Sequence, residues 1–273
     1  MHDKQTGSAP DRVPARFRID LAYDGTNFSG WAIQPGRRTV EGVLTEALQR
    51  IYRHDVKLTV AGRTDAGVHA TGQVCHADLL EMPDLARRLN RLLDDDVRIL
   101  DARVVPSEFD ARFSALWRRY EYRVTRTPNP LRRLDTLAWP HPLDLDRMSA
   151  AAATLVGEHD FVAFCRRKEL ATTIREVTRL DWRREPDGVL VATVQADAFC
   201  QQMVRSLVGA MLAVGEGRRE PDWPGNLLRR TERVSEVPVA PAHGLTLVAV
   251  GYPEETEFQA RARVTRSLRT RLA

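Results

Sequence analysis

The stretch "AGRTDAGVHATGQV", residues 61–74, places Arg63, Asp65 and His69 among small residues. Small neighbours let a bulky planar substrate approach a carboxylate, which can then act as a nucleophile or a base while it is ionised. Arg63 is expected to keep Asp65 ionised, because a nearby cation favours the charged form. Asp and Gly also favour surface turns, and an Arg-x-Asp pair is often only a surface ion pair. Taken alone, the stretch leaves both interpretations open.

Other kinds of chemistry find little support. The stretch lacks the Gly-Lys-Ser/Thr ending of a phosphate-binding loop. Cys75, Cys165 and Cys200 are far apart and form no C-x-x-C pair, which argues against a disulfide framework or a zinc site. Cys75 and His76 are neighbours on a predicted strand and would point to opposite faces. We therefore expect no metal site, and each cysteine is predicted to be a small buried apolar residue.

The length and hydropathy of the chain set its broad class. With 273 residues it is near the size at which a single core stops growing, which favours two lobes. No apolar run approaches the roughly 18 residues that a membrane span needs. Residues 1–15 lack the apolar core of a signal peptide and are predicted to be a disordered leader. A cytoplasmic protein is the expectation.

The basic residues are mostly arginines: of 41, only Lys4, Lys57 and Lys168 are lysine. Arginine suits phosphate and base recognition better than lysine does. The cluster at 112–126 interleaves arginines with aromatic residues, and the basic cluster at 166–168 lies close to aromatic residues. Such combinations are typical of surfaces that bind nucleic acid. Judged from charge alone, a solvent-exposed arginine face is slightly favoured over a nucleic-acid-binding surface. The basic tail, residues 254–273, fits either a frayed helix or an arm that touches RNA.

The hydrophobic patterning predicts helices and strands in alternation. Amphipathic or apolar helical patterns occur at 39–53, 82–94, 146–157 and 200–217, and strand patterns at 17–23, 57–62, 72–79, 96–105, 118–126, 177–185, 189–199 and 243–252. The pair at 177–199 contains the turn signal Pro186-Asp187-Gly188 and is predicted to be a hairpin. The order of elements is similar in both halves, which indicates an α+β protein with two related lobes.

Five blocks of this sequence resemble the tRNA pseudouridine synthase A family. They are "YDGTNFSGW" (23–31), the stretch at 61–74, "FDARFSALWRRYEY" (109–122), "FCQQMVRSLVGAMLAVGEG" (199–217) and "HGLTLVAVGYP" (243–253). The resemblance covers nearly all of residues 17–253. It implies a pseudouridine synthase fold with mixed or antiparallel sheets and flanking helices around a central basic cleft. Residues 16–115 would form the lobe with the catalytic loop, and residues 116–253 the second lobe.

The resemblance also implies an activity. Such enzymes convert uridine to pseudouridine at positions 38, 39 and 40 of the tRNA anticodon stem-loop, without a metal or cofactor, and act as homodimers. Two alternatives remain: a synthase of the same fold that acts on other uridines, and a non-catalytic RNA-binding protein.

Site residues follow from the matching motifs. Asp65 is implied to be the catalytic aspartate. Tyr120 would stack on the target base, and Arg63 would contact the RNA backbone. Arg205, on an otherwise apolar helix, would need a buried partner, and we expect that partner to be Asp65. His69 is expected to line the cleft or to bond to backbone.

Supporting residues and departures complete these expectations. Asp24 is expected to cap the first turn, and Asp110 with Arg112 to organise the site from behind. Tyr122 is expected to pack in the core. The sequence departs from the family at Ala32, at Gln202 and in "NRLLDDDV" (90–97), which puts local RNA contacts in doubt. Acidic residues 94–96 would repel phosphate if they faced it.

Overall fold

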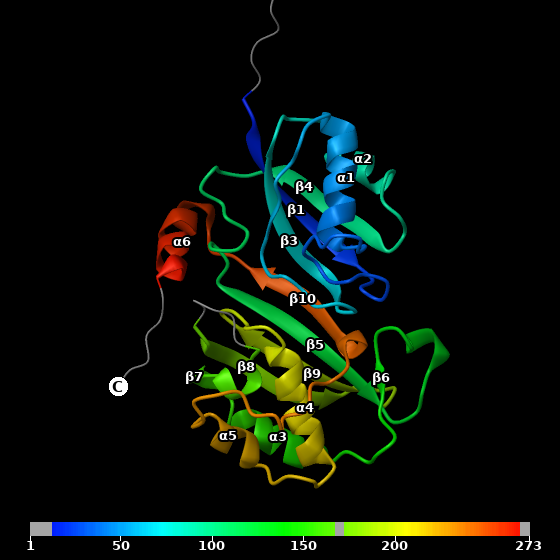
Figure 1. Ribbon diagram of the computed structural model, residues 1–273, viewed down its shortest axis with the longest axis vertical. Helices are drawn as coiled ribbons and strands as arrows, with labels where there is room; N and C mark the ends of the chain where they lie inside the picture. Colours follow the sequence, from blue (N-terminus) through cyan, green and yellow to red (C-terminus); the bar gives the residue numbers. More distant parts are fainter. Residues whose placement is uncertain (1–12, 167–171, 268–273) are drawn as a thin grey trace, which may run out of the picture.

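The computed structural model describes residues 13–166 and 172–267 and forms an α+β fold around one mixed sheet (Figure 1). Its strand order is β4-β1-β3-β10-β5-β9-β8-β7, with β2 paired to β3 and β6 to β5. The strands are β1 (Ala15–Tyr23), β2 (Thr59–Val60), β3 (His69–Leu79), β4 (Val97–Val104), β5 (Trp117–Thr125), β6 (Leu137–Ala138), β7 (Gly157–Asp160), β8 (Ile174–Arg184), β9 (Leu190–Ala196) and β10 (Leu245–Gly251).

The helices are α1 (Val40–Tyr52), α2 (Leu85–Asn90), α3 (Leu145–Ala153), α4 (Met203–Gly215), α5 (Trp223–Leu227) and α6 (Phe258–Arg266). Short 3₁₀ turns occur at Pro130–Arg132, Val162–Phe164, Ala242–Gly244 and Glu255–Glu257. The predicted helices and the hairpin β8–β9 are confirmed. The patterning did not predict β6, β7 or α5, which have two, four and five residues. The described part of the basic tail forms α6.

The two halves of the chain meet at a short parallel seam. β10 pairs with β3 only through Thr246 opposite His69 and Leu247 opposite Ala70, while its pairing with β5 is antiparallel and longer. The last strand of the chain therefore lies between the N-terminal strands and β5. One sheet runs through both halves, so the proposed division near residue 115 remains a prediction.

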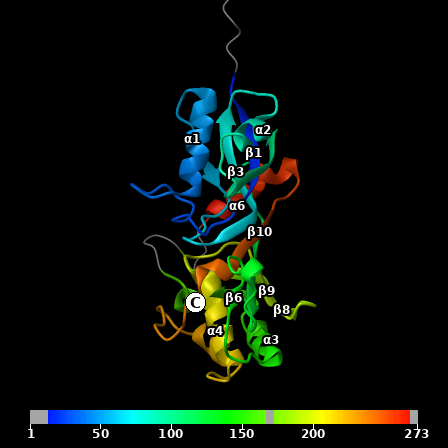
Figure 2. The ribbon, with the colours of Figure 1, turned by 90° about the vertical axis from the view of Figure 1, so that its right-hand side faces the viewer.

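The sheet has two unlike faces, because successive side chains of a strand point to opposite sides. We call the face that carries Tyr120 and Tyr122 the front face, and the face that carries Glu121 and Arg123 the back face. The front face is largely apolar; its side chains include Ile19, Leu21, Cys75, Leu79, Leu247, Tyr122, Val194, Ala192 and Trp182. Figure 2 shows α1 and α4 on the same side of the sheet.

Local sequence explains the two helices. Thr39 caps α1 by accepting a hydrogen bond from the Gly42 N–H, and the apolar stripe of α1 includes Leu44 and Leu48, both fully buried. Every residue of α4 except Arg205 is buried, as expected for a helix that is apolar all round.

The back face is charged. Its arginines and acids pair across or along strands; they include Arg18, Asp20, Arg103, Glu121, Arg123, Arg179, Asp181 and Arg183. Residues 105–116 and α6 cover one part of it, where Val74, Phe109 and Phe258 form a second small core. The rest of this face carries no helix among the described residues.

The structure corrects one prediction about the cysteines. Cys165 and Cys200 form a disulfide, with their Cα atoms 5.7 Å apart, whereas Cys75 is a buried free thiol, as predicted. The two cysteines are 35 residues apart in sequence. They meet because the turn after Val162–Phe164 folds against the segment before α4, where the Arg166 N–H donates to the Gln201 carbonyl at 3.0 Å. Sequence spacing alone does not show this approach.

Parts of both chain ends lie outside the residues that the structure describes. Residues 1–12 of the predicted leader and residues 268–273 of the tail lie outside them, as do residues 167 and 168 of the basic cluster at 166–168. Ala15, the last residue of the predicted leader, already belongs to β1. Across the described ranges, the model contains no helix with the length and apolar character needed to cross a membrane.

Candidate active site

The loop at 61–68 is fixed from below by a buried polar network. Thr64 is 6% exposed, and its Oγ1 lies 2.8 Å from the Tyr23 hydroxyl. The Gln73 amide donates to the Tyr23 hydroxyl at 3.2 Å and to the Gly62 carbonyl at 2.8 Å. Burial raises the pKa of Tyr23 to about 12, so its hydroxyl stays neutral. The network holds the residues on either side of Arg63 in place.

The segment after β1 fixes the loop from its other side. The Trp31 N–H donates to the Thr64 carbonyl at 3.1 Å. Gly30 has a φ of +94°, and a Cβ there would lie 2.9 Å from the Thr64 carbonyl oxygen. Only glycine suits both the left-handed backbone and this close approach. The block "YDGTNFSGW" therefore supports the backbone of Asp65.

Asp65 and Arg205 form an ion pair, as expected. Nη1 of Arg205 lies 3.5 Å from Oδ2 of Asp65, and the two side chains are 18% and 31% exposed. Nε of Arg205 donates to the Ala240 carbonyl at 2.7 Å, which fixes the guanidinium at the start of α4. A partly exposed carboxylate thus lies beside a held cation at the seam between the two halves.

Arg63 does not take the place that the sequence suggested. Its side chain is exposed and makes no ion pair with Asp65 or with any other residue in the described ranges. The ion-pair partner of Asp65 is not Arg63 but Arg205 of α4, 140 residues away in the sequence. Arg63 is left as an exposed cation two residues from Asp65.

Tyr120 lies on the front face of β5 and is 7% exposed. Phe199 packs edge-on against its ring, with ring centroids 5.2 Å apart and an interplanar angle of 86°. Burial, with smaller contributions from Tyr23 and Asp65, raises the pKa of the Tyr120 phenol. Tyr122 packs in the core, as expected, and donates to the Pro241 carbonyl at 2.8 Å.

His69 bonds to backbone and faces away from Asp65. Its Nδ1 lies 3.0 Å from the Gly25 N–H that donates to it, and its Nε2 lies 3.1 Å from the His243 carbonyl. A neutral ring with its proton on Nε2 satisfies both contacts. Nδ1 is also 3.1 Å from Oδ1 of Asp24, so a protonated ring would instead form an ion pair there.

Asp24 caps its turn as predicted. It accepts hydrogen bonds from the backbone N–H of Thr26 at 2.9 Å and from its hydroxyl at 2.6 Å. Behind the loop at 61–68, Asp110 accepts hydrogen bonds from the N–H groups of Arg112 and Phe113, each at 2.9 Å. These contacts organise turns and leave the chemistry to other residues.

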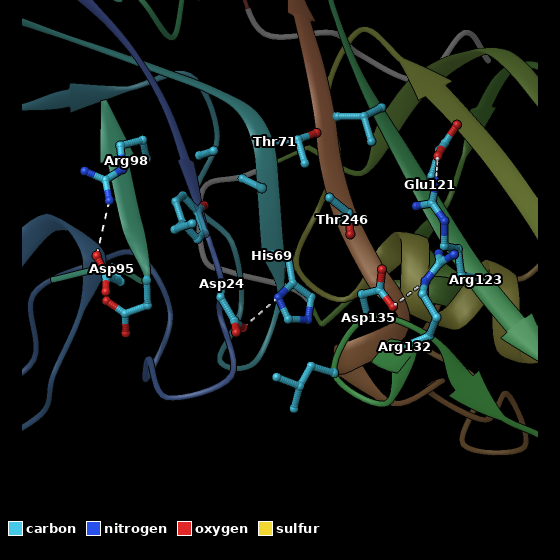
Figure 3. A pocket seen from close by; sticks show the side chains of 16 residues that line it. Asp24, His69, Thr71, Asp95, Arg98, Glu121, Arg123, Arg132, Asp135 and Thr246 are labelled. Carbon is cyan, nitrogen blue, oxygen red and sulfur yellow. Dashed lines mark hydrogen bonds and ion pairs between the residues drawn. The ribbon is translucent and has the colours of Figure 1, made fainter. Parts of the chain in front are cut away.

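A cavity of about 650 Å³ lies on the back face and is not lined by Asp65 (Figure 3). It is lined by side chains of mixed charge, among them Asp24, His69, Glu121, Arg123 and Arg132. Glu121 and Arg123 alternate with Tyr120 and Tyr122, so this cavity and the Asp65 loop lie on opposite sides of the sheet. The arrangement of groups, rather than the size of the hollow, identifies the candidate active site.

Two other expectations concern the departures from the family pattern. Asp94 and Asp96 pair with Arg38, and Asp95 pairs with Arg98, so their charges are partly compensated. Gln202 has a left-handed backbone with a φ of +66° and accepts a hydrogen bond from Arg233 at 3.0 Å.

One buried cation, Arg118, was not singled out from the sequence. Arg118 is 6% exposed and donates to the carbonyls of Ala61, Arg112 and Asp197. The signal was present, because Arg118 is two residues before Tyr120 and strand alternation puts both on one face. No group of three or more metal-ligating side chains occurs within residues 13–166 and 172–267.

Comparison with known proteins agrees with this geometry. The family model described as "tRNA pseudouridine synthase" matches residues 21–114 and 151–253. The chain belongs to this family. The two matched segments contain Asp65 and Arg205, the ion pair at the seam, and end at the close of β10.

Relatives named "tRNA pseudouridine synthase A" match this family member over most of its length. The relative from Frankia casuarinae is 61% identical, covering 93% of this chain and 95% of its own. Relatives from Mycobacterium leprae and Streptomyces griseus are 51% and 54% identical, covering 93% of this chain and 96% and 94% of theirs. A solved structure of a Cbf5-Nop10-Gar1 complex is 13% identical to this chain, with a TM-score of 0.30; the match covers 72% of this chain and 54% of that one.

Proposed function

We propose that this chain isomerises uridine to pseudouridine at positions 38, 39 and 40 of the tRNA anticodon stem-loop, with Asp65 as the catalytic carboxylate. The observation that carries the proposal is the ion pair between Asp65 and Arg205, 3.5 Å apart, beside Tyr120 at the seam of the sheet. The family and the names of its close relatives support the choice of tRNA as substrate.

The reaction needs no net change of atoms. The bond between N1 and C1′ breaks, a bond between C5 and C1′ forms, C5 loses its proton to solvent, and N1 gains one. A lone ionised carboxylate can serve such a step as nucleophile or base. Arg205 holds the carboxylate in place, and the phenol of Tyr120, which stays neutral, can donate or accept a hydrogen bond near the base.

The target uridine must leave the stem before it can reach Asp65, at a cost of a few kcal/mol. Arg63, exposed and unpaired among the described residues, is placed to contact phosphate next to the flipped nucleotide. The ring of Phe199 lies against that of Tyr120 with the two ring planes nearly perpendicular, so Phe199 would lie next to a base that stacks on Tyr120.

A homodimer in the cytoplasm, with one tRNA touching both subunits, completes the proposal. Segment 112–133 is a candidate for the shared surface, since it combines several arginines with Leu131, which is 91% exposed. The mass of the protein in solution, alone and with tRNA, tests the dimer. A monomer of 30.9 kDa at assay concentration would contradict it.

The first experiment uses transcribed tRNA with tritium at C5 of uridine. Wild-type protein should release the label into water, because the new bond at C5 must expel it. Asp65→Ala should bind the tRNA and release at least about 100-fold less, the scale of a catalytic group. Asp181→Asn, an exposed carboxylate on the back face, is the matched control and should release as wild type does.

The outcomes separate the alternatives. If wild-type protein binds tRNA but releases no label, a non-catalytic RNA-binding role replaces the enzyme. If the label is released but maps to uridines outside positions 38–40, the protein is a synthase with other targets. If Asp65→Ala releases as fast as wild type, another group performs the chemistry.

A further inference from the structure

Arg118 is a buried cation without a carboxylate partner. It lies on the front face of β5, two residues before Tyr120, and is 6% exposed. Among the described residues, no Asp or Glu lies within ion-pair distance of its guanidinium, unlike Arg123 and Arg183 on the back face, which both pair with Glu121. A buried charge is costly unless its hydrogen bonds are satisfied, so its acceptors matter.

The guanidinium of Arg118 is satisfied by three backbone carbonyls. Nε and Nη2 donate to the Ala61 carbonyl at 3.2 and 2.7 Å, and Nη2 also donates to the Arg112 carbonyl at 2.6 Å. Nη1 donates to the Asp197 carbonyl at 2.7 Å. The planar fork of arginine can reach three acceptors in different directions at once, which the single ammonium of lysine does less well.

Each of these carbonyls begins or supports a part of the candidate active site. Ala61 follows β2 and opens the loop that carries Asp65. Asp197 follows β9 and opens the segment that carries Phe199, which packs on Tyr120, and then leads into α4 with Arg205. Arg112 belongs to the turn held by Asp110. One side chain on β5 thus contacts the segments leading to Asp65, Phe199 and Arg205.

This linkage matters because the backbone pairing at the seam is short. β3 and β10 pair through His69–Thr246 and Ala70–Leu247, and this is the one pairing between N-terminal and C-terminal strands within residues 13–166 and 172–267. The bonds from Arg118 to Ala61 and Arg112 cross this junction, and the bond to Asp197 stays within the C-terminal half. The two crossing bonds do not depend on strand register.

We propose that Arg118 is a positioning residue that sets the Asp65 loop against Tyr120 and α4 through its hydrogen bonds to Ala61, Arg112 and Asp197. The inference rests on the proposed function, since it concerns the same reaction. Arg118 holds these segments through the planar geometry of its guanidinium, and a positive charge by itself is not sufficient for this positioning. The guanidinium touches no reacting atom and does not titrate near neutral pH.

Three variants test the proposal: Arg118→Met, Arg118→Lys and the control Arg179→Met. Arg179 lies on β8, faces the back, and pairs with Asp181. Single-turnover tritium release at saturating tRNA gives the rate, filter binding gives the tRNA Kd, and thermal melting reports folding. All three are measured from pH 6 to pH 8.

Both Arg118 variants should release label at least about 10-fold more slowly, because misplacement of a reacting group by about 1 Å can cost up to about 100-fold. Their tRNA Kd should stay within about threefold of wild type, and the loss should be the same at every pH. Arg179→Met should match wild type. If melting shows that Arg118→Met does not fold, Arg118→Lys decides the question.

Two results would overturn the proposal. A rate for Arg118→Lys close to wild type would show that charge alone suffices. A weaker Kd with an unchanged rate at saturating tRNA would show that Arg118 serves binding. If wild-type protein itself releases no label, the proposed function fails, which is a separate result from either of these.

Discussion

The arginines on the two faces of the sheet have different kinds of partner. On the front face Arg118 is 6% exposed and bonds only to carbonyls, and Arg205 of α4 reaches Asp65 beside Tyr120. On the back face Arg123 and Arg183 both pair with Glu121, and a cavity of about 650 Å³ opens beside Arg123. The charged face with this cavity is therefore not the one with the candidate catalytic groups.

The difference shows where charge has a function beyond solvation. On the back face, opposite charges neutralise each other, as Arg123 and Arg183 do with Glu121. On the front face, a cation placed in an apolar surface has few partners, so each contact fixes a particular segment. Changes on the front face should therefore act on catalysis, and changes on the back face on stability.

The largest effect is expected for the front-face ion pair. Arg205→Gln removes the cation that holds Asp65 and should slow single-turnover tritium release by about 100-fold, the scale of breaking a partly buried charge pair. Arg179→Gln removes the cation of a back-face pair whose two side chains are about half exposed, and should change the rate less than about twofold. Equal losses in the two variants would remove the distinction between the faces.

His76 lies on the covered part of the back face, where its Nδ1 accepts from the Ala111 N–H at 3.0 Å. Burial lowers its pKa from 6.5 to about 4, so the folded protein keeps the ring neutral. Below pH 6.5 the unfolded chain binds a proton that the folded protein does not, so the free energy of unfolding falls as the pH drops toward 4.

The measurement is urea unfolding at pH 7 and pH 4.5, for wild type and for His76→Gln, which keeps an acceptor for the Ala111 N–H. Wild type should lose about 2 kcal/mol more than the variant between these two pH values. A pH dependence that is the same in both proteins would mean that His76 is already accessible to protons in the fold.

A smaller effect is expected from the Tyr120 hydroxyl. Tyr120→Phe keeps the ring and its contact with Phe199 and removes only the hydroxyl, so the rate should fall by about 5- to 10-fold, the scale of one hydrogen bond. Because burial raises the pKa of this phenol, the alkaline side of the pH–rate profile should be unchanged up to about pH 9. An alkaline limb that disappears in the variant would show that Tyr120 does ionise.

The smallest effect is expected on the open back face. Asp181→Asn breaks an ion pair with Arg179 in which both side chains are about half exposed. The free energy of unfolding should change by less than about 0.5 kcal/mol in urea titrations, and less still in high salt. A loss above about 1 kcal/mol would show that the back-face charges act as a coupled network.

Local pattern was sufficient for much of this protein. The stripe of α1, the apolar sequence of α4 and the alternation in β5 each follow from neighbouring residues, because helix and strand periods are properties of local backbone geometry. The stretch around Asp65 was singled out by its resemblance to the family motif, since its residues alone left two interpretations open. The partnership of Arg205 with Asp65 was predicted because an arginine on a buried helix must have a partner and the resemblance implied that Asp65 lies near it.

Other features depended on which distant segments meet. The disulfide between Cys165 and Cys200 and the three carbonyls around Arg118 join segments separated by tens of residues. The displacement of Arg63 by Arg205, and the orientation of His69 toward the back face, likewise depended on the placement of α4 and β10. Sequence determined which residues could do chemistry, and tertiary structure decided which of them face each other, because strand order and seam geometry are set by packing between segments far apart in the chain.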